Sequence, residues 1–270
     1  MNIIHIITDL KFGGTEKVLS RLVLNDQNNH HIVISLKKKR EIGKDLESKN
    51  IEVIEIDIMK YHIIKSLLNI IRIIKSLKPD IVQTWMYHAN LIGGIAAKLA
   101  GVKIISWNVR NSYLYSSSIK TKFINILSIF FSYFIPNKII YCSNISKNLH
   151  ESYGYRRVSN IIKNGYNFSV FHPDEDSRKL IRKKYLNKKN FLIGMVARWD
   201  KIKGHNILLE AAAILIEQGY DFHLLLIGED CDQYNDELNR IINKYQLREY
   251  ISLCGHVDDM PQIINGLDIK

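Results

Sequence analysis

The stretch Phe191–Gly219, FLIGMVARWDKIKGHNILLEAAAILIEQG, most constrains what this chain can fold into. Phe191–Ala197 is an apolar run without alternation, which is typical of a strand buried on both faces of a parallel sheet. Apolar residues then recur at helical spacing from Ile207 to Ile216, and Gly219 stands where a helix C-cap is expected. The order of strand, loop and helix predicts one βα unit of an α/β fold.

The loop of this unit concentrates positive charge. Arg198, Lys201 and Lys203 precede Gly204 and the predicted helix. The free N–H groups and the dipole of a helix N-terminus favour an anion, and an arginine can hold a phosphate through two hydrogen bonds. The loop is therefore a candidate anion site. The competing interpretation is an ordinary charged loop, which open α/β sheets carry in many places.

The same alternation runs through the first half of the chain. Apolar runs and helical periodicity predict, in order, strand 2–8, helix 16–24, strands 31–36 and 51–56, helix 63–77, strand 81–84, helix 91–100 and strand 103–107. This spacing predicts a doubly wound parallel sheet, whose ligands bind beyond the carboxyl ends of the strands. The restart of the pattern at Phe191 predicts a second α/β domain.

The charge is unevenly spread between the two halves. Residues 1–172 hold 24 Lys and Arg against 11 Asp and Glu, whereas residues 173–270 hold 14 against 16, for net charges of +13 and −2 that sum to the chain's +11. We therefore expect two domains with these ranges, the first of which faces something anionic.

Three groups of polar residues follow predicted strands in the first half. They are the loop Gly13, Gly14, Thr15 and Glu16, the segment Trp85–His88, and Asn108 with Arg110 and Asn111. Paired glycines let backbone N–H groups approach a ligand, although a plain tight turn has the same signature. His88 is a candidate substrate contact or acid–base group, and the alternative is a histidine in a surface loop.

The cysteines and the most apolar run exclude several classes of protein. Three scattered cysteines without a CxxC spacing predict a reduced, cytoplasmic chain without a disulfide framework or a zinc site. The first residues lack the basic leader and the cleavage site of a signal peptide. Phe123–Ile135 is too short to cross a bilayer, which takes about 20 residues, and we expect a buried helix there.

In order and spacing, several motifs together resemble the retaining glycosyltransferases of glycosyltransferase family 4. The motifs are Gly13-Gly14-Thr15-Glu16, Gln83–Gly93, Ser143–Ser146, Ile162–Pro173, Gly194–Ala211, Leu225–Asp230 and Leu253–Ile269. The resemblance covers essentially the whole chain. It implies an α/β chain with the GT-B fold, which has two Rossmann-like domains facing each other across a cleft.

The resemblance also implies roles for individual residues. Arg198 and Lys203 look like the pair that holds the donor diphosphate and neutralises the leaving nucleoside diphosphate, without a metal or other cofactor. The loop Gly13–Glu16 resembles the one that approaches the donor phosphate from the first domain, through the amide of Gly14. The nucleobase is expected beside Gly228 and Glu229 and the loop that contains His256 and Val257.

Two departures from the family pattern affect what we expect. Asn108 stands where many members have a histidine that contacts the reacting sugar, and an asparagine cannot take a proton near neutral pH. The family's pair of glutamates, which binds donor sugar and ribose, follows the strand that begins at Leu267, and the given sequence ends at Lys270. We therefore expect the second domain to be incomplete, as in a truncated glycosyltransferase.

The resulting hypothesis is a transferase that moves a sugar, with retention, from a nucleotide-sugar such as a uridine diphosphate sugar. The acceptor is a growing glycan or a lipid-linked or surface polysaccharide precursor, and peripheral contact with an anionic membrane is expected from the basic first half. The alternative is a catalytically inactive, truncated remnant that binds nucleotide or a partner protein. No pattern of stacking aromatic residues or helix-turn-helix accompanies the charge, so nucleic acid is not the expected partner.

Overall fold

The computed structural model describes residues 1–58, 63–111, 119–186 and 191–270, and these form two compact units, 1–165 and 166–270. In the first unit the elements are β1 (Asn2–Ile7), α1 (Gly14–Asn25), β2 (His30–Ser35), α2 (Arg40–Ser48), β3 (Glu52–Glu55), α3 (Ile63–Leu77), β4 (Ile81–Trp85), α4 (Met86–Leu99), β5 (Ile104–Val109), α5 (Ile119–Phe131), β6 (Lys138–Tyr141), α6 (Asn144–Ser152) and β7 (Ser159–Ile161). In the second they are α7 (Glu175–Tyr185), β8 (Phe191–Val196), the 3-10 turn η1 (Lys201–Lys203), α8 (His205–Glu217), β9 (Phe222–Ile227), α9 (Asp236–Lys244), the 3-10 turn η2 (Arg248–Tyr250), β10 (Ile251–Gly255) and α10 (Met260–Gly266).

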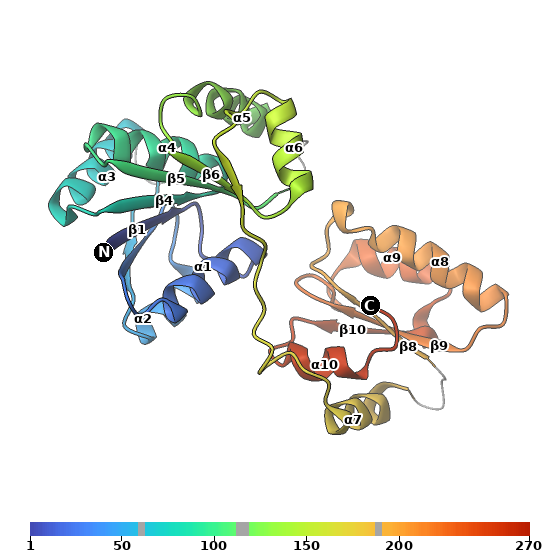
Figure 1. Ribbon diagram of the computed structural model, residues 1–270. Helices are drawn as coiled ribbons and strands as arrows, with labels where there is room; N and C mark the ends of the chain where they lie inside the picture. Colours follow the sequence, from blue (N-terminus) through green and yellow to red (C-terminus); the bar gives the residue numbers. More distant parts are fainter. Residues whose placement is uncertain (59–62, 112–118, 187–190) are drawn as a thin grey trace. The chain divides into compact units, whose positions relative to one another are not determined.

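The first unit is built on a parallel sheet with the strand order β3-β2-β1-β4-β5-β6-β7. Helices α1 and α2 cover one face, where Leu19 and Leu46 are buried, and α3 and α4 cover the other, where Ile70 and Ala96 are buried (Figure 1). This confirms the predicted doubly wound sheet. The order reverses between β1 and β4, and ligands of such sheets bind at the carboxyl ends of the strands beside that point.

The second unit repeats the arrangement on a smaller sheet, with the order β10-β9-β8. Helices α8 and α9 pack on one face, and α7 and α10 on the other. After α10 the chain returns to β8: the N–H of Asp268 donates to the carbonyl of Leu192 over 2.8 Å, and the N–H of Gly194 donates to that of Ile269 over 2.9 Å. The residues after Leu267 thus pair as the predicted next strand.

The units divide earlier than the predicted boundary at Pro173. Arg21 of α1 donates from Nη1 to the carbonyl of Gly165 over 2.8 Å, which ties that residue to the first unit. The carbonyl of His172 instead accepts from Nδ2 of Asn265, in α10, over 3.1 Å. The boundary predicted from the net charge, at Pro173, therefore lies C-terminal to the boundary between the two units.

Three predicted elements of the first unit differ from the structure. The segment between the predicted strands 31–36 and 51–56 contains the helix α2, which was not predicted because only Ile42, Gly43 and Leu46 of it are buried. Helix α4 begins at Met86, so that His88 lies in its first turn and not in a loop. Strand β5 extends to Val109, so that Asn108 lies within the strand.

The prediction that Phe123–Ile135 forms a buried helix is correct for the helix but wrong for its burial. Helix α5 spans Ile119–Phe131, but Phe123, Ile126 and Phe130 are exposed. The segment is apolar around most of its circumference, so its periodicity does not indicate which face packs against the sheet.

Candidate functional site

The loop Gly13–Glu16 lies at the carboxyl end of β1, beside the point where the strand order reverses. Gly13 is the N-cap of α1 and is fully extended, with φ −170° and ψ 163°, and no side chain caps the helix. A side chain at position 13 would collide with the carboxylate of Glu16, whereas the space above Gly14 is open. Because the first N–H groups of a helix have no acceptor within it, this end of α1 can receive an anionic or hydroxyl-bearing ligand.

The start of α4 lies beside it, at the carboxyl end of β4. Met86 has a φ of 69°, in the left-handed region that costs a residue other than glycine free energy, and such strain recurs at functional sites. His88 is half-buried on the first turn of the helix. Burial, and then the positive charge of Lys37 beyond β2, lower the pKa of His88. The imidazole is therefore neutral at pH 7 and can accept a hydrogen bond.

Arg110 joins the ends of three strands at this edge. Its guanidinium lies over the ring of Trp85, 5.5 Å from the ring centroid, and donates to Oδ1 of Asn164 over 2.8 Å and to the carbonyl of Ile162 over 3.2 Å. Its backbone N–H contacts the sulfur of Met86 at 3.4 Å. Arg110 therefore holds the strand ends together and adds a fixed positive charge to them.

Asn108 is fully buried, and its side chain has no protein partner in the described part of the chain. Neither Oδ1 nor Nδ2 makes a hydrogen bond there. A buried amide that leaves both polar atoms unpaired costs about 1–3 kcal/mol for each group, so it requires an explanation such as a bound ligand or a water molecule. The predicted role of Asn108 as a sugar contact remains a prediction.

In the second unit, Arg198 leaves the carboxyl end of β8 and is paired with Asp200. Its Nη2 and Nε donate to Oδ2 of Asp200 over 2.9 and 3.3 Å, and its side chain is 45% exposed. The other oxygen of Asp200 accepts from the N–H of Ile202 over 3.2 Å, which caps η1. That hydrogen bond, the bond from Arg198 and the charge of Lys203 lower the pKa of Asp200. The carboxylate of Asp200 therefore interacts electrostatically with both Arg198 and Lys203, the two residues that are predicted to bind the phosphate.

Lys203 and Gly204 form the junction between η1 and α8. Lys203 is exposed, and Gly204 has a φ of 82°, which a glycine adopts without strain. No side chain caps α8, whose 13 residues make its N-terminus a strong positive dipole end. The predicted combination of two cations and a free helix N-terminus is therefore present, in one loop of the second unit.

The loops after β9 and β10 interlock with the Arg198 loop. The N–H of Gly228 donates to the carbonyl of Gly255 over 2.7 Å, and the N–H of Trp199 donates to that of Glu229 over 2.8 Å. A side chain at position 228 would overlap the backbone of Ala197, so only a glycine fits there. The structure thus brings Glu229 and Gly228 against the Arg198 loop.

His256 and Val257 continue from Gly255 into the loop after β10. Val257 packs against the apolar cluster beneath α10, whereas the ring of His256 is partly exposed, with Nε2 3.4 Å from an oxygen of Asp258. All the predicted donor-binding residues of the second unit therefore lie at the carboxyl edge of its sheet.

A cysteine and a histidine below this edge do not form a nucleophilic pair. Sγ of Cys231 lies 3.6 Å from Nε2 of His205, but burial raises the pKa of the Cys231 thiol to about 12, and burial lowers that of His205. A neutral thiol beside a neutral imidazole is not activated. Nor do three His, Cys, Asp or Glu side chains of the described residues gather into a group that could hold a metal ion.

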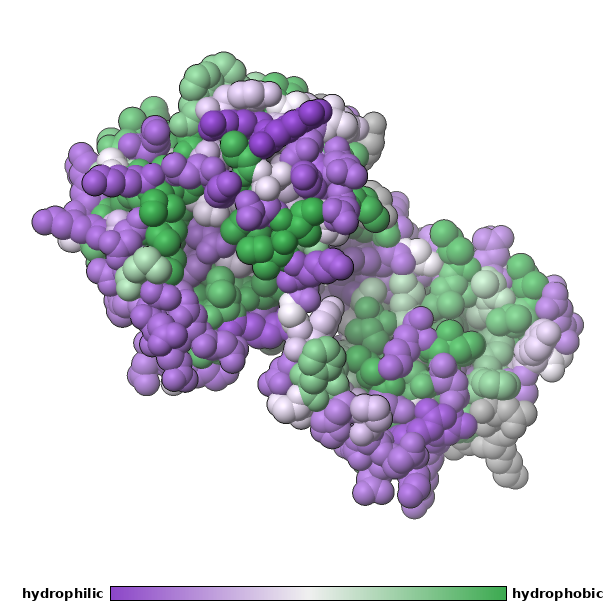
Figure 2. Space-filling model, viewed as in Figure 1, coloured by the Kyte–Doolittle hydropathy of each residue, from purple (hydrophilic) through white to green (hydrophobic). Residues whose placement is uncertain are grey.

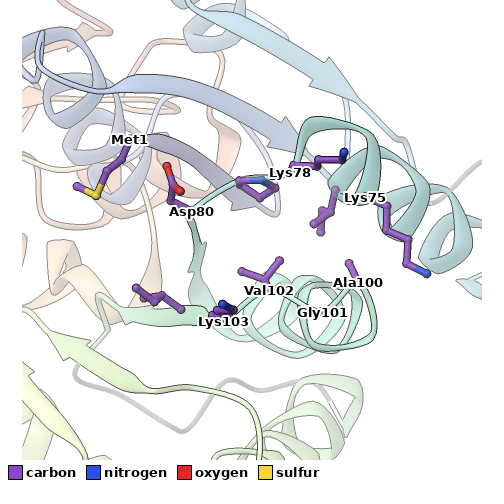
Figure 3. Close-up of a pocket in the computed structure, with 11 residues that line it drawn as sticks. Met1, Lys75, Lys78, Asp80, Ala100, Gly101, Val102 and Lys103 are labelled. Carbon is purple, nitrogen blue, oxygen red and sulfur yellow. The ribbon is translucent and has the colours of Figure 1, made fainter.

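A broad cavity of about 690 Å³ lies at the opposite edge of the first sheet (Figure 3). It is lined by Met1, by the end of α3 with Lys75 and Lys78, and by Val102 and Lys103 before β5. The cavity thus lies at the amino ends of β1, β4 and β5. It is therefore separate from the candidate site, whose residues lie at the carboxyl ends of the strands.

Lys37 and Asp200 belong to the site region but were not among the predicted site residues, and Arg110 was predicted only as a member of a polar group after a strand. Lys37 and Arg110 each follow a strand within two residues, so the rule that ligands bind at carboxyl ends was sufficient to find them. Asp200 is only two residues after Arg198, so the sequence alone indicates a local charge pair and gives no signal for a role of Asp200 in the site.

Two family models match the chain, one in each unit. Residues 16–125 match the family described as "Glycosyl transferase 4-like", and residues 176–270 match "Glycosyl transferases group 1". The described residues contain no helix that is both long and apolar enough to span a bilayer.

Curated relatives include two bacterial enzymes. The chain is 26% identical over 246 residues to the capsular polysaccharide biosynthesis glycosyltransferase CapM of Staphylococcus aureus, a match that covers 84% of this chain and 62% of CapM. It is 27% identical over 213 residues to the UDP-Gal:alpha-D-GlcNAc-diphosphoundecaprenol alpha-1,3-galactosyltransferase of Escherichia coli, which covers 76% of this chain and 54% of that enzyme. The chain therefore spans little more than half the length of these relatives.

Solved structures of the same fold cover nearly all of the chain. The crystal structure of Anabaena Alr3699/HepE in complex with UDP-glucose superposes with a TM-score of 0.83 at 19% identity, over 99% of this chain and 72% of that one. The lipopolysaccharide outer core galactosyltransferase WaaB superposes with a TM-score of 0.63 at 15% identity, over 98% and 70%. The predicted GT-B-like fold is thus confirmed, and each of the two units matches one of the two glycosyltransferase family models.

Proposed function

We propose that this chain transfers a sugar from a uridine diphosphate sugar to a growing glycan or lipid-linked polysaccharide precursor, with retention of configuration. The observation that carries the proposal is the loop of Arg198, Lys203 and the uncapped N-terminus of α8. Because a departing nucleoside diphosphate gains negative charge on its β-phosphate, fixed positive groups at this place stabilise the transition state more than the ground state.

No metal ion is part of the proposal, because Arg198, Lys203 and the α8 dipole supply the positive charge that a cation would bring. Gly228 and Glu229 lie against the same loop, and with His256 and Val257 they are the proposed contacts of the nucleoside. This assignment is supported by the UDP-glucose that the similar HepE structure contains.

The first unit is proposed to bind the acceptor and to contribute to the sugar pocket. Its strand ends carry Lys37 and Arg110, whose positive charge suits an acceptor that contains phosphate. The name of the E. coli relative states a diphosphoundecaprenol acceptor, which supports a lipid-linked precursor for this chain as well. We place the reaction in the cytoplasm, with Gly13–Glu16 and His88 as further proposed donor or sugar contacts.

Calorimetric titration of the chain with uridine diphosphate tests the proposal. We expect saturable binding that a chelator does not change, with weaker binding of guanosine diphosphate as the control nucleotide. Incubation with uridine diphosphate sugars and a lipid-linked acceptor is then expected to release uridine diphosphate, and nuclear magnetic resonance of the product reports the anomeric configuration. Absence of nucleotide binding by a chain that is folded by circular dichroism would contradict the proposal.

Replacement of Asn108 by leucine separates a ligand contact from a structural role. Leucine has a similar volume and removes two unpaired buried polar atoms, so we expect the free energy of unfolding to stay within about 1 kcal/mol of the wild type or to rise. We expect the transfer rate to fall about tenfold, because one hydrogen bond to the sugar is lost. Unchanged turnover, measured beside denaturant unfolding, would remove Asn108 from the site.

A further inference from the structure

Helix α5 and the turn after it direct an apolar stripe to the surface. Phe123, Ile126, Phe130 and Phe134 are 61%, 63%, 60% and 61% exposed, and Tyr133 beside them is 53% exposed. The spacing of three or four residues places these side chains along one side of the helix. Exposed apolar residues scattered singly are normal, but a contiguous row marks an interaction surface.

The opposite side of the same segment is mixed, because Ile124, Ile129 and Phe131 pack against the core of the first unit beside buried polar side chains. Asn125, Ser128 and Ser132 are 7%, 0% and 0% exposed, and so face the core of the first unit. Oγ of Ser132 donates to the carbonyl of Ile129 over 2.7 Å and accepts from the N–H of Arg156 over 2.9 Å. A helix at a protein–water boundary is expected to be polar on its outward side, whereas α5 carries apolar side chains on both sides. The distribution of side chains on α5 therefore suits an apolar environment outside the protein.

The aromatic rings of the stripe form one surface. The rings of Phe130 and Phe134 lie 5.3 Å apart between centroids, in a tilted pair. Figure 2 shows apolar atoms at the edge of the first unit where Figure 1 draws α5. The two rings at the C-terminal end of the stripe are thus in contact.

A positive charge lies at each end of the stripe, in a segment of the chain that is rich in Lys and Arg. Residues 101–165, which include α5, contain nine Lys and Arg but only one Asp or Glu. Lys122 is exposed directly before Phe123, and Nη1 of Arg156 donates to the carbonyl of Tyr133 over 3.3 Å at the other end. An apolar row between cations is the pattern of a helix that lies in the interface of an anionic bilayer.

We propose that the α5 stripe, defined as Phe123, Ile126, Phe130, Tyr133 and Phe134, docks the chain on the surface of an anionic lipid bilayer. The apolar side chains enter the boundary between headgroups and acyl chains, while the surrounding Lys and Arg side chains contact the lipid phosphates. A second copy of the chain is the less favourable occupant, because it would bring two strongly basic surfaces together.

The proposal goes beyond the transfer reaction, since it concerns where the chain resides. It agrees with a lipid-linked acceptor but does not depend on one. Vesicle binding is measured without donor or acceptor, so a failure of docking and a failure of the transferase proposal are observed separately.

Co-sedimentation of the full chain with vesicles tests the docking. We expect binding to vesicles of phosphatidylcholine mixed with phosphatidylglycerol, a decrease in binding as salt is raised, and little binding to phosphatidylcholine alone. The double variant Phe130→Gln/Phe134→Gln is expected to bind about tenfold more weakly, because two aromatic side chains no longer leave water. Both residues are exposed, so the variant should fold like the wild type.

The matched control replaces two exposed apolar residues of the second unit, Ile214→Gln/Tyr220→Gln, and is expected to bind like the wild type. Equal binding of the stripe variant and the wild type would overturn the proposal, as would equal binding to phosphatidylcholine alone. A dimer in analytical ultracentrifugation that the stripe variant loses, without any vesicle binding, would assign the stripe to a second copy of the chain instead.

Discussion

Replacement of Arg198 or Lys203 by alanine is expected to weaken uridine diphosphate binding by about 1.5–3 kcal/mol each, the range for a hydrogen bond to a charged group. Arg198 can meet a diphosphate with two N–H groups at once, whereas Lys203 acts as a point charge, so Arg198→Lys should recover only part of the loss. The two residues act on one ligand, so their effects need not add. Calorimetry on the single and double variants measures both the size and the coupling.

Substitution of Asp200 provides a control that is expected to strengthen nucleotide binding. In the free chain its carboxylate accepts from Arg198, and so competes with a phosphate for the same guanidinium. Asp200→Asn keeps an oxygen for the N–H of Ile202 but removes the negative charge, and it should therefore tighten nucleotide binding. Lys179→Ala, which removes an exposed positive charge from α7, should leave binding unchanged. If the Arg198 and Lys203 variants bind as well as Lys179→Ala, the phosphate lies elsewhere.

The elements that the sequence predicts well are those with one dominant physical cause. Phe191–Val196 has no polar side chain, and Phe222–Ile227 has only that of His223, because helices cover both faces of this parallel sheet. Gly219 has a φ of 80° after α8, as predicted from its place beyond the last periodic residue. The rule that ligands bind at carboxyl ends then places the candidate residues without knowledge of the structure.

The features that could not be predicted depend on tertiary packing. In α5 and the turn after it, Ser128 and Ser132 face the core, where their small side chains fit, while Phe130 faces outward. The periodicity of the sequence predicts neither orientation. Strand β5 extends past Trp107 because Asn108 pairs with Trp85 of β4 in register. An asparagine inside a buried strand contradicts its own propensity, and such local conflicts are common at functional sites.

A buried chain of polar groups lies under the first-unit site, in the centre of the sheet. Nε1–H of Trp85 donates to Nδ1 of His5 over 3.3 Å, so that the proton of a neutral His5 is on Nε2. That nitrogen is 3.0 Å from Nδ1 of His31 and therefore donates to it, and Nε2 of His31 lies 3.3 Å from Oδ2 of Asp26. His5 thus accepts from Trp85 and donates to His31, whose Nε2 faces the carboxylate of Asp26.

Protonation of His5 breaks this chain, because its Nδ1 would then become a second donor facing Trp85. Burial, and then the neighbouring His31, lower the pKa of His5 to about 3 from an ordinary value of 6.5. Between these two pH values the unfolded chain binds a proton that the folded chain does not, so the free energy of unfolding falls as the pH falls. The loss from this group begins below pH 6.5 and approaches about 1.4 kcal/mol per pH unit.

We therefore expect His5→Gln to flatten the pH dependence of unfolding of the first unit between neutral and acidic pH, relative to the wild type. Glutamine can accept the hydrogen bond from Trp85 but does not titrate in this range. The control is His30→Gln, since His30 is the exposed neighbour of His31 and should leave the slope unchanged. Denaturant titrations at a series of pH values measure the slopes, and equal slopes for the wild type and His5→Gln would show that His5 takes up its proton in the folded state. His5 lies on β1, which leads to the loop Gly13–Glu16, and Trp85 lies at the end of β4 beneath Arg110, so the centre of the sheet that we expect to be acid-sensitive also supports the first-unit residues of the proposed site.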